Sequence, residues 1–161
     1  MKGRNRQSGF SLIELLIVVA IILIIAAIAI PSLVKAKQAS NETSAAGSLK
    51  SVYTGLVGYS DQCSTGFPAT LTNAGPGDGS CAGGTNHLDS VMGVANPAKS
   101  GYAFAYLPGT AATDGKVYSM NLAADPISPR SGIKHFLITE DGVVHYSLTA
   151  AATISDPALG K

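Results

Sequence analysis

One acidic residue, Glu14, stands inside a long apolar segment near the start of this 161-residue chain. The 21 residues from Phe10 to Ile30 contain no other ionisable side chain. Such a segment is long enough to cross a bilayer as a helix. A carboxylate in a spanning helix costs roughly 2.5–3.5 kcal/mol on insertion scales, so it usually has both a function and a partner. The obvious partner is a positive charge that appears later, on another chain or at a newly cut N-terminus.

The apolar segment follows a short basic leader that contains Lys2, Arg4 and Arg6. Positive flanking residues stay in the cytoplasm, so the chain after the helix is expected on the other side of the membrane. Two plainer interpretations are a secretory signal peptide cut after Ala29 and a simple signal anchor. The apolar run is longer than a signal-peptide core, and neither interpretation accounts for Glu14.

The stretch Gly9-Phe10-Ser11-Leu12-Ile13-Glu14 resembles the processing site of type IV prepilins and of the related pseudopilins of type II secretion. The resemblance covers about the first 31 residues. It implies that a dedicated membrane peptidase cuts after Gly9 and methylates the new N-terminus at Phe10. Glu14 is then the fifth residue of the mature chain. Pro31 falls where many pilins have a proline that bends the helix.

The resemblance and the chain's own pattern together predict a leader, a membrane helix and an exported head. The leader is residues 1–9, the membrane and filament-core helix is 10–30, and the head is 31–161. Within the head we expect a helix to about residue 60, a loop over 63–100, a sheet over 101–147 and a loosely held tail over 148–161.

The helix is expected to continue beyond Pro31 because helix-forming residues follow it. An apolar stripe at i, i+3, i+4 and i+7 is formed by Leu49, Val52, Tyr53 and Leu56, which is typical of a helix packed on one face. Three glycines in this region are expected to weaken the helix locally; they are Gly47, Gly55 and Gly58.

Alternating apolar residues begin at Tyr102 and predict strands, with two further strand segments at 117–122 and 135–139. A fourth segment, 143–147, follows a hairpin turn at Glu140-Asp141-Gly142. Between helix and sheet, the loop is expected to hold a short helical turn near 88–91. The predicted fold class is therefore α+β and pilin-like, with one long N-terminal helix on a small antiparallel sheet of about four strands.

Two cysteines, Cys63 and Cys81, are predicted to form one disulfide that closes a loop rich in Gly and Pro, since an exported domain favours oxidation. A redox pair or a metal site would be expected to show C-x-x-C spacing, which is absent. In the best-known pilins the disulfide closes a C-terminal loop, whereas the two cysteines of this chain follow the predicted helix. The chain also lacks the aspartate-rich calcium loop associated with the major pseudopilin, and Asp114, Asp125 and Asp141 are expected to be turn residues.

The sequence shows no catalytic constellation, so we expect no enzyme activity, cofactor or metal site. Loss of Lys2, Arg4 and Arg6 with the leader leaves 8 basic against 10 acidic residues, a net charge near −2, and a basic patch for nucleic acid is not expected. His135 and His145 are expected to face each other across the hairpin, and His87 to lie in the loop.

The resemblance implies a structural filament subunit that serves adhesion, twitching motility or DNA uptake. Its implied partners are copies of itself and other pilins, the prepilin peptidase and methyltransferase, and a pilus assembly platform with its ATPase. Before assembly it would lie in the inner membrane with its head outside the cytoplasm, and afterwards in an extracellular or periplasmic filament. A pseudopilin of type II secretion is the alternative, and a membrane-anchored binding module is the alternative from another class.

Overall fold

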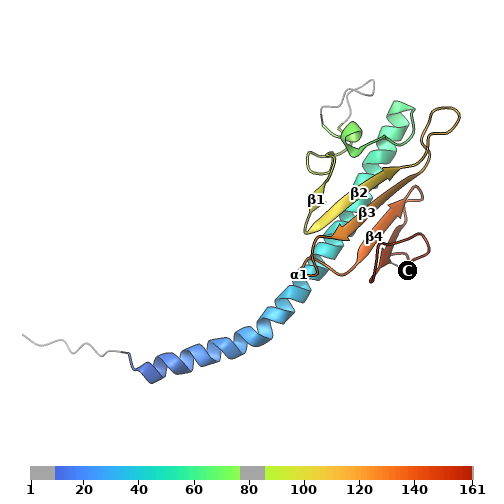
Figure 1. Ribbon diagram of the computed structural model, residues 1–161. Coiled ribbons are helices and arrows are strands. Elements are labelled where there is room, and N and C mark those ends of the chain that lie inside the picture. The colour runs from blue at the N-terminus through green and yellow to red at the C-terminus, as the bar shows by residue number, and fades with distance from the viewer. Residues whose placement is uncertain (1–9, 77–85, 161) are drawn as a thin grey trace, which may run out of the picture. The chain divides into compact units, whose positions relative to one another are not determined.

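The computed structural model describes residues 10–76 and 86–160 (Figure 1). It contains one long helix, one 3-10 helix and five strands. In chain order they are α1 (Leu12–Cys63), η1 (Leu71–Ala74), β1 (Ala98–Lys99), β2 (Tyr102–Pro108), β3 (Met120–Pro126), β4 (His135–Thr139) and β5 (Val144–Ser147). The predicted α+β class, with a long helix on an antiparallel sheet, is confirmed. The chain divides after Ala36 into two compact units.

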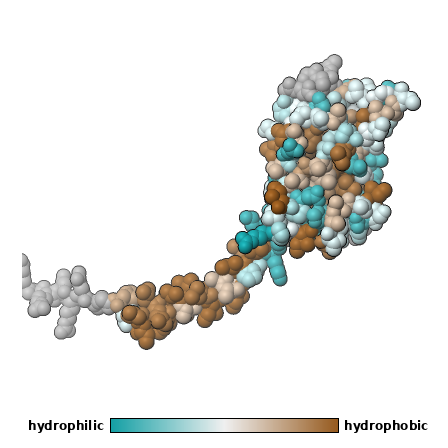
Figure 2. Space-filling model, viewed as in Figure 1, coloured by the Kyte–Doolittle hydropathy of each residue, from teal (hydrophilic) through white to brown (hydrophobic). Residues whose placement is uncertain are grey.

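The first unit consists of the N-terminal part of α1. Its large apolar side chains are largely exposed, and Figure 2 shows them as a hydrophobic surface. Among the described residues, α1 is the one helix that is long and apolar enough to cross a membrane, judged by length and composition. Pro31 lies inside α1, which continues through it as expected. A bend at Pro31 stays a prediction.

The second unit has the C-terminal part of α1 packed on an antiparallel sheet. The strands follow each other in sequence order, β1-β2-β3-β4-β5, as a meander. The central register pairs Leu122 with Tyr106 on one side and with Ile138 on the other. Because strand side chains alternate between faces, one face carries the apolar residues that meet the helix. The principal buried side chains are Leu49, Val52 and Leu56 of α1 and Tyr102, Phe104, Met120, Leu122, Phe136, Ile138 and Val144 of the sheet. The apolar stripe predicted for the helix therefore forms the side of the core that faces the sheet.

Two features of the sheet differ from the prediction. The sheet has five strands, because β1 contributes two residues, too few to produce a periodic pattern. The third strand begins at Met120, three residues after the predicted start at Val117. Val117 instead forms a parallel bridge with Gly66, where Phe67 N donates to Val117 O at 2.8 Å. Val117 is therefore paired through its backbone like a strand residue, but its partner is the segment after α1 and it lies outside β3.

The connection between helix and sheet contains one element that was not predicted, the 3-10 helix at Leu71–Ala74. The short helical turn expected near 88–91 is present as a single turn, in which Gly93 N donates to Asp89 O at 2.8 Å. Asp89 accounts for the turn, because its carboxylate accepts from Met92 N at 2.8 Å and from Val91 N at 3.1 Å. An aspartate whose carboxylate accepts from the backbone N–H groups two and three residues ahead caps a helical turn at its N-terminal end.

The C-terminal tail is held against the sheet, so the expectation of a loosely held tail is wrong. Leu159 N donates to Val144 O at 2.7 Å, and Tyr146 N donates to Pro157 O at 3.1 Å. These bonds occupy the free edge of β5, which would otherwise present unpaired backbone groups. The composition of the tail gave no sign of this because the contacts are made by backbone atoms.

Candidate functional site

The first turn of α1 contains the acidic residue that the sequence singled out. Ser11 precedes the helix, and its N–H donates to Glu14 Oε2 at 2.9 Å. This is one half of a capping box, in which an acidic residue in the first turn satisfies a free N–H. The carboxylate also lies at the positive end of the helix dipole. Phe10 is 85% exposed beside it. Glu14 thus bonds the N–H of Ser11, the residue that directly follows Phe10, the predicted new N-terminus.

Other parts of the predicted processing and cross-linking sites fall partly outside the described residues. Gly9 and the rest of the leader lie outside them, so cleavage after Gly9 and methylation of Phe10 stay predictions. Cys63, the last residue of α1, is not a free thiol. Cys81 lies outside the described residues, and the pairing of Cys63 with Cys81 also stays a prediction.

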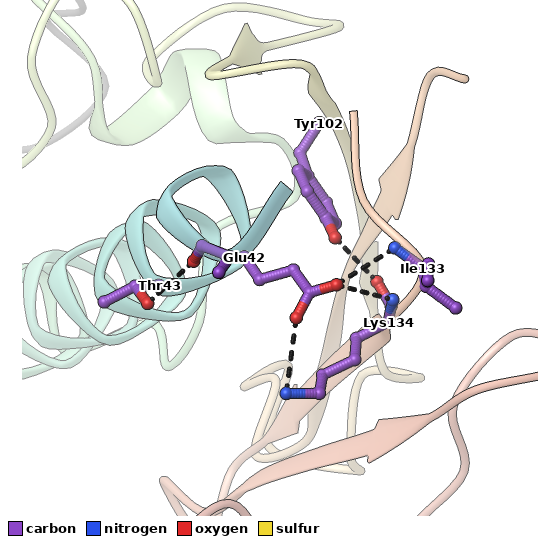
Figure 3. A network of polar contacts seen from close by, with 6 residues as sticks. Glu42, Thr43, Tyr102, Ile133 and Lys134 are labelled. Atoms are coloured by element: carbon purple, nitrogen blue, oxygen red, sulfur yellow. Dashed lines mark hydrogen bonds and ion pairs between the residues drawn. The ribbon is translucent and has the colours of Figure 1, made fainter. Parts of the chain in front are cut away.

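A polar clamp joins α1 to the start of β4, and it is centred on Glu42 (Figure 3). Glu42 Oε1 accepts from Ile133 N at 3.0 Å and from Lys134 N at 3.4 Å. Its other oxygen, Oε2, lies 3.3 Å from Lys134 Nζ. The Glu42 side chain is 14% exposed, so these three donors satisfy a carboxylate that water hardly reaches.

Tyr102 extends the clamp into the sheet. Its hydroxyl donates to Lys134 O at 2.9 Å. Burial, followed by the nearby negative charges of Glu42 and Asp125, raises the pKa of the Tyr102 phenol above its ordinary value. The phenol therefore remains a hydrogen-bond donor over the whole physiological range.

Sequence reasoning placed Glu42 in a polar stretch and missed this role. The signal was present, because Glu42 stands three, four and seven residues before Ala45, Ala46 and Leu49. It therefore continues the apolar stripe on the face that meets the sheet.

The loop between β3 and β4 is fastened to the same helix by side-chain amides. Gln38 Nε2 donates to Pro129 O at 2.6 Å, and Asn41 Nδ2 donates to Ser131 O at 2.8 Å. Ser44 and Ser100 share a hydroxyl–hydroxyl bond of 2.9 Å. Successive turns of α1 therefore hold residues that are 91, 90 and 56 positions away in the sequence.

The histidines do not pair across the hairpin, and that expectation is wrong. The register places Ser147 opposite His135 and Leu137 opposite His145. His135 Nδ1 lies 2.6 Å from Asp125 Oδ1, and His145 Nδ1 lies 2.7 Å from Asp156 O. His87 Nε2 lies 2.9 Å from Gln62 Oε1. Within residues 10–76 and 86–160, no group of three or more His, Cys, Asp or Glu residues is arranged to hold a metal ion.

The three aspartates singled out in the sequence have local partners. Asp141 accepts from Thr139 Oγ1 at 2.8 Å and from Val143 N at 3.0 Å in the hairpin turn. Asp114 accepts from Lys116 N and from the Tyr118 hydroxyl. These contacts account for Asp114 and Asp141 as turn residues. The same expectation for Asp125 is wrong, because Asp125 lies in β3 and pairs with His135 of β4.

An exposed apolar helix with an acidic first turn, and a head in which α1 packs on an antiparallel sheet, fit the pilin-like α+β fold expected from the sequence. Residues 4–30 match the family model described as the prokaryotic N-terminal methylation motif. A segment of 49 residues, 30% of this chain, is 55% identical to the type IV major pilin protein PilA of Myxococcus xanthus (strain DK1622). The match spans 22% of that relative's length. No solved structure matches the chain. The two matches support the type IV pilin family, on the N-terminal segment that carries the methylation motif.

Proposed function

We propose that the chain is a structural subunit of a type IV pilus. The observation that carries the proposal is Glu14 in the first turn of an exposed apolar helix, next to the residue where the family motif predicts the mature N-terminus. The relative with which it shares its N-terminal segment is named a major pilin. The filament would serve adhesion, twitching motility or DNA uptake.

Before assembly the subunit is stored in the inner membrane through its apolar helix, with the head outside the cytoplasm. The prepilin peptidase cuts after Gly9 and methylates Phe10. An assembly platform and its ATPase then move the helix from lipid into a filament of like subunits and other pilins. This exchanges one apolar surrounding for another, so packing and pairing between helices must supply the gain.

In the filament, Glu14 of one subunit pairs with the Phe10 amine of its neighbour. In the single chain the Glu14 carboxylate bonds the Ser11 N–H, so it already has a local donor at the helix end. Cleavage after Gly9 adds a positive amine at Phe10, the residue before Ser11. Removing one partner of a buried ion pair costs roughly 3–5 kcal/mol, which is enough to set the register between subunits.

Two variants separate pairing from capping. Glu14→Gln keeps an oxygen that can accept the Ser11 N–H but loses the charge, whereas Glu14→Ala loses both. We expect both variants to be cleaved and methylated normally and to form few or no filaments in electron micrographs of sheared cells. Normal filaments from Glu14→Gln would show that capping, and not charge pairing, is the role of Glu14.

The first experiment is intact-mass and N-terminal analysis of protein sheared from its native cell. The proposal expects a start at methylated Phe10, and a mass two hydrogens lighter than that of the dithiol if Cys63 and Cys81 are joined. An uncut leader, or a start after Ala29, would overturn it in favour of an anchored or secreted binding module. Long surface fibres distinguish a pilus from the short periplasmic filament of a type II secretion pseudopilin.

A further inference from the structure

A polar pocket of about 430 Å³ lies between α1 and two loops of the second unit. Lys37 and Asn41 line it from the helix, and Ser100 lines it from the turn before β2. The β3–β4 loop contributes Ser128 and Arg130. Two cationic side chains and several hydroxyls therefore share one hollow.

The two cations of this pocket have no acidic partner in the part of the chain that the structure describes. The ion pairs there are Lys134 with Glu42 and His135 with Asp125. Glu42, the nearest carboxylate along the helix, is already satisfied by Lys134 and two backbone N–H groups. Lys37 and Arg130 are both exposed. The pocket thus presents two uncompensated positive charges.

The backbone that carries Arg130 is held in place on the helix. The residues on either side of it, Pro129 and Ser131, accept hydrogen bonds from Gln38 and Asn41 at 2.6 and 2.8 Å. A loop fastened on both sides of its cation loses little further freedom when it binds an anion, which favours binding.

An apolar hollow of about 330 Å³ adjoins the cations on the same loop. It is lined in part by Ile127 and Ile133, which are 61% and 54% exposed. Basic residues next to exposed aliphatic side chains are typical of a surface that lies at a membrane interface.

The position of Lys37 in the sequence points to the same partner. It follows Ile30, the end of the predicted membrane helix, by seven residues, or about 10.5 Å of helix rise, and Leu33 and Val34 continue the apolar residues to within three positions of it. If the apolar run spans the bilayer, Lys37 lies at the depth of the lipid headgroups. Basic residues on the exported flank oppose the positive-inside rule, so a role for Lys37 there would explain its presence.

We propose that Lys37, Arg130 and the adjoining serines bind the phosphate of an anionic phospholipid while the subunit is stored in the membrane. The proposal rests on the membrane storage proposed above. The Arg130 guanidinium can bind phosphate oxygens through two parallel N–H groups, and the Lys37 ammonium adds a point charge. Ile127 and Ile133 contact the glycerol and upper acyl region. The headgroup contact holds the head beside the bilayer until the subunit is extracted.

The test uses the full chain in detergent micelles and counts bound lipid by native mass spectrometry. Phosphatidylglycerol is compared with phosphatidylcholine at equal concentration, and inorganic phosphate is added in a separate arm. We expect the wild type to retain phosphatidylglycerol in preference. The double variant Lys37→Gln/Arg130→Gln should bind it about 25-fold more weakly, about fivefold for each basic residue.

The control variant Lys50→Gln/Lys116→Gln removes the same charge elsewhere on the head and should retain phosphatidylglycerol like the wild type. An equal loss in both double variants, or no preference over phosphatidylcholine, would overturn the proposal. Inorganic phosphate that binds without any phosphatidylglycerol retention would also overturn it and indicate a free-ion site. Wild-type lipid retention in Lys37→Gln/Arg130→Gln, together with failed assembly, would assign the cations to a carboxylate of a neighbouring subunit instead.

The outcome is separable from that of the proposed function. The Glu14→Gln variant should retain lipid like the wild type, because Glu14 lies far from the pocket in the sequence. A chain that keeps its leader in the cell and yet retains phosphatidylglycerol selectively would refute the pilin function and leave the lipid site standing.

Discussion

At the scale of single residues, Glu42 makes three polar contacts that join α1 to the residues at the start of β4. The Glu42→Gln substitution keeps the shape but removes the charge that Lys134 Nζ faces at 3.3 Å and weakens two charge-assisted bonds. We expect the free energy of unfolding to fall by about 1–3 kcal/mol. Urea denaturation of the full chain in micelles, followed by circular dichroism, measures it. Glu140→Gln, at an exposed residue of the hairpin turn, is the control and should change stability by less than about 0.5 kcal/mol. Equal effects of the two substitutions would contradict the role of Glu42.

Acid stability also depends on single residues. The Val143 N–H, followed by the Thr139 hydroxyl, holds the pKa of Asp141 below its usual value, and bonds from Thr153 do the same for Asp156. A carboxyl group whose pKa is lowered in the folded state stabilises it above the unfolded pKa of about 3.9. That stabilisation is lost as the pH falls through the lowered folded pKa.

The free energy of unfolding should therefore decline below about pH 4. Asp141→Asn should reduce this decline, leaving the parts contributed by Asp156 and by Asp114, whose pKa is lowered by the Tyr118 hydroxyl and the Lys116 N–H. Urea denaturation at several pH values between about 6 and 2 measures how the free energy of unfolding changes with pH. Asp61→Asn, at an exposed position near the end of α1, is the control. An unchanged slope in Asp141→Asn would show that its turn contacts do not favour the ionised form.

At the scale of elements, the glycines of α1 have different roles. A Cβ on Gly55 would lie 2.4 Å from the His87 backbone oxygen, while a Cβ on Gly47 would meet nothing within 4 Å. Gly58 faces the His87 ring, where a Cβ would lie 3.0 Å from Nδ1. The glycines at 55 and 58 thus let the loop before β1 approach the helix closely. Sequence reasoning gave all three only the cost of a flexible backbone.

This difference predicts opposite effects of the same substitution. Gly47→Ala should stabilise the head by about 0.5–1 kcal/mol, since alanine favours a helix and enters open space. Gly55→Ala should destabilise it despite the same gain in helix propensity, because the backbone at His87 must move. Thermal unfolding of both variants beside the wild type is the measurement. Stabilisation by Gly55→Ala would mean that the loop does not pack against α1 in this way.

At the scale of the whole molecule, the chain carries two kinds of surface. The N-terminal part of α1 exposes aliphatic side chains over more than five turns, and one chain by itself leaves them uncovered (Figure 2). The head has a core of its own, built from one face of α1 and one face of the sheet. Water strongly disfavours the first surface and accepts the second. The full chain therefore needs lipid or other copies of the same helix, which is the physical basis of the proposed storage and assembly.

The sequence by itself determined the features that depend on local pattern. The apolar run with Glu14, the stripe of Leu49, Val52 and Leu56, and the hairpin at Gly142 were each visible as a spacing or a residue type. The structure has them as predicted, with Gly142 in the left-handed region at φ 73°. Periodicity and turn chemistry act over a few residues, so they can be read without knowing the fold.

Only the tertiary structure decided which distant residues meet. It paired Val117 with Gly66, placed the tail along β5, directed Glu42 to Lys134, and brought Lys37 and Arg130 to one pocket. These contacts join residues far apart in the chain through backbone groups or lone polar side chains, which leave no periodic trace in a single sequence. Their geometry follows from the packing of the helix on the sheet, and the proposed lipid site depends on it.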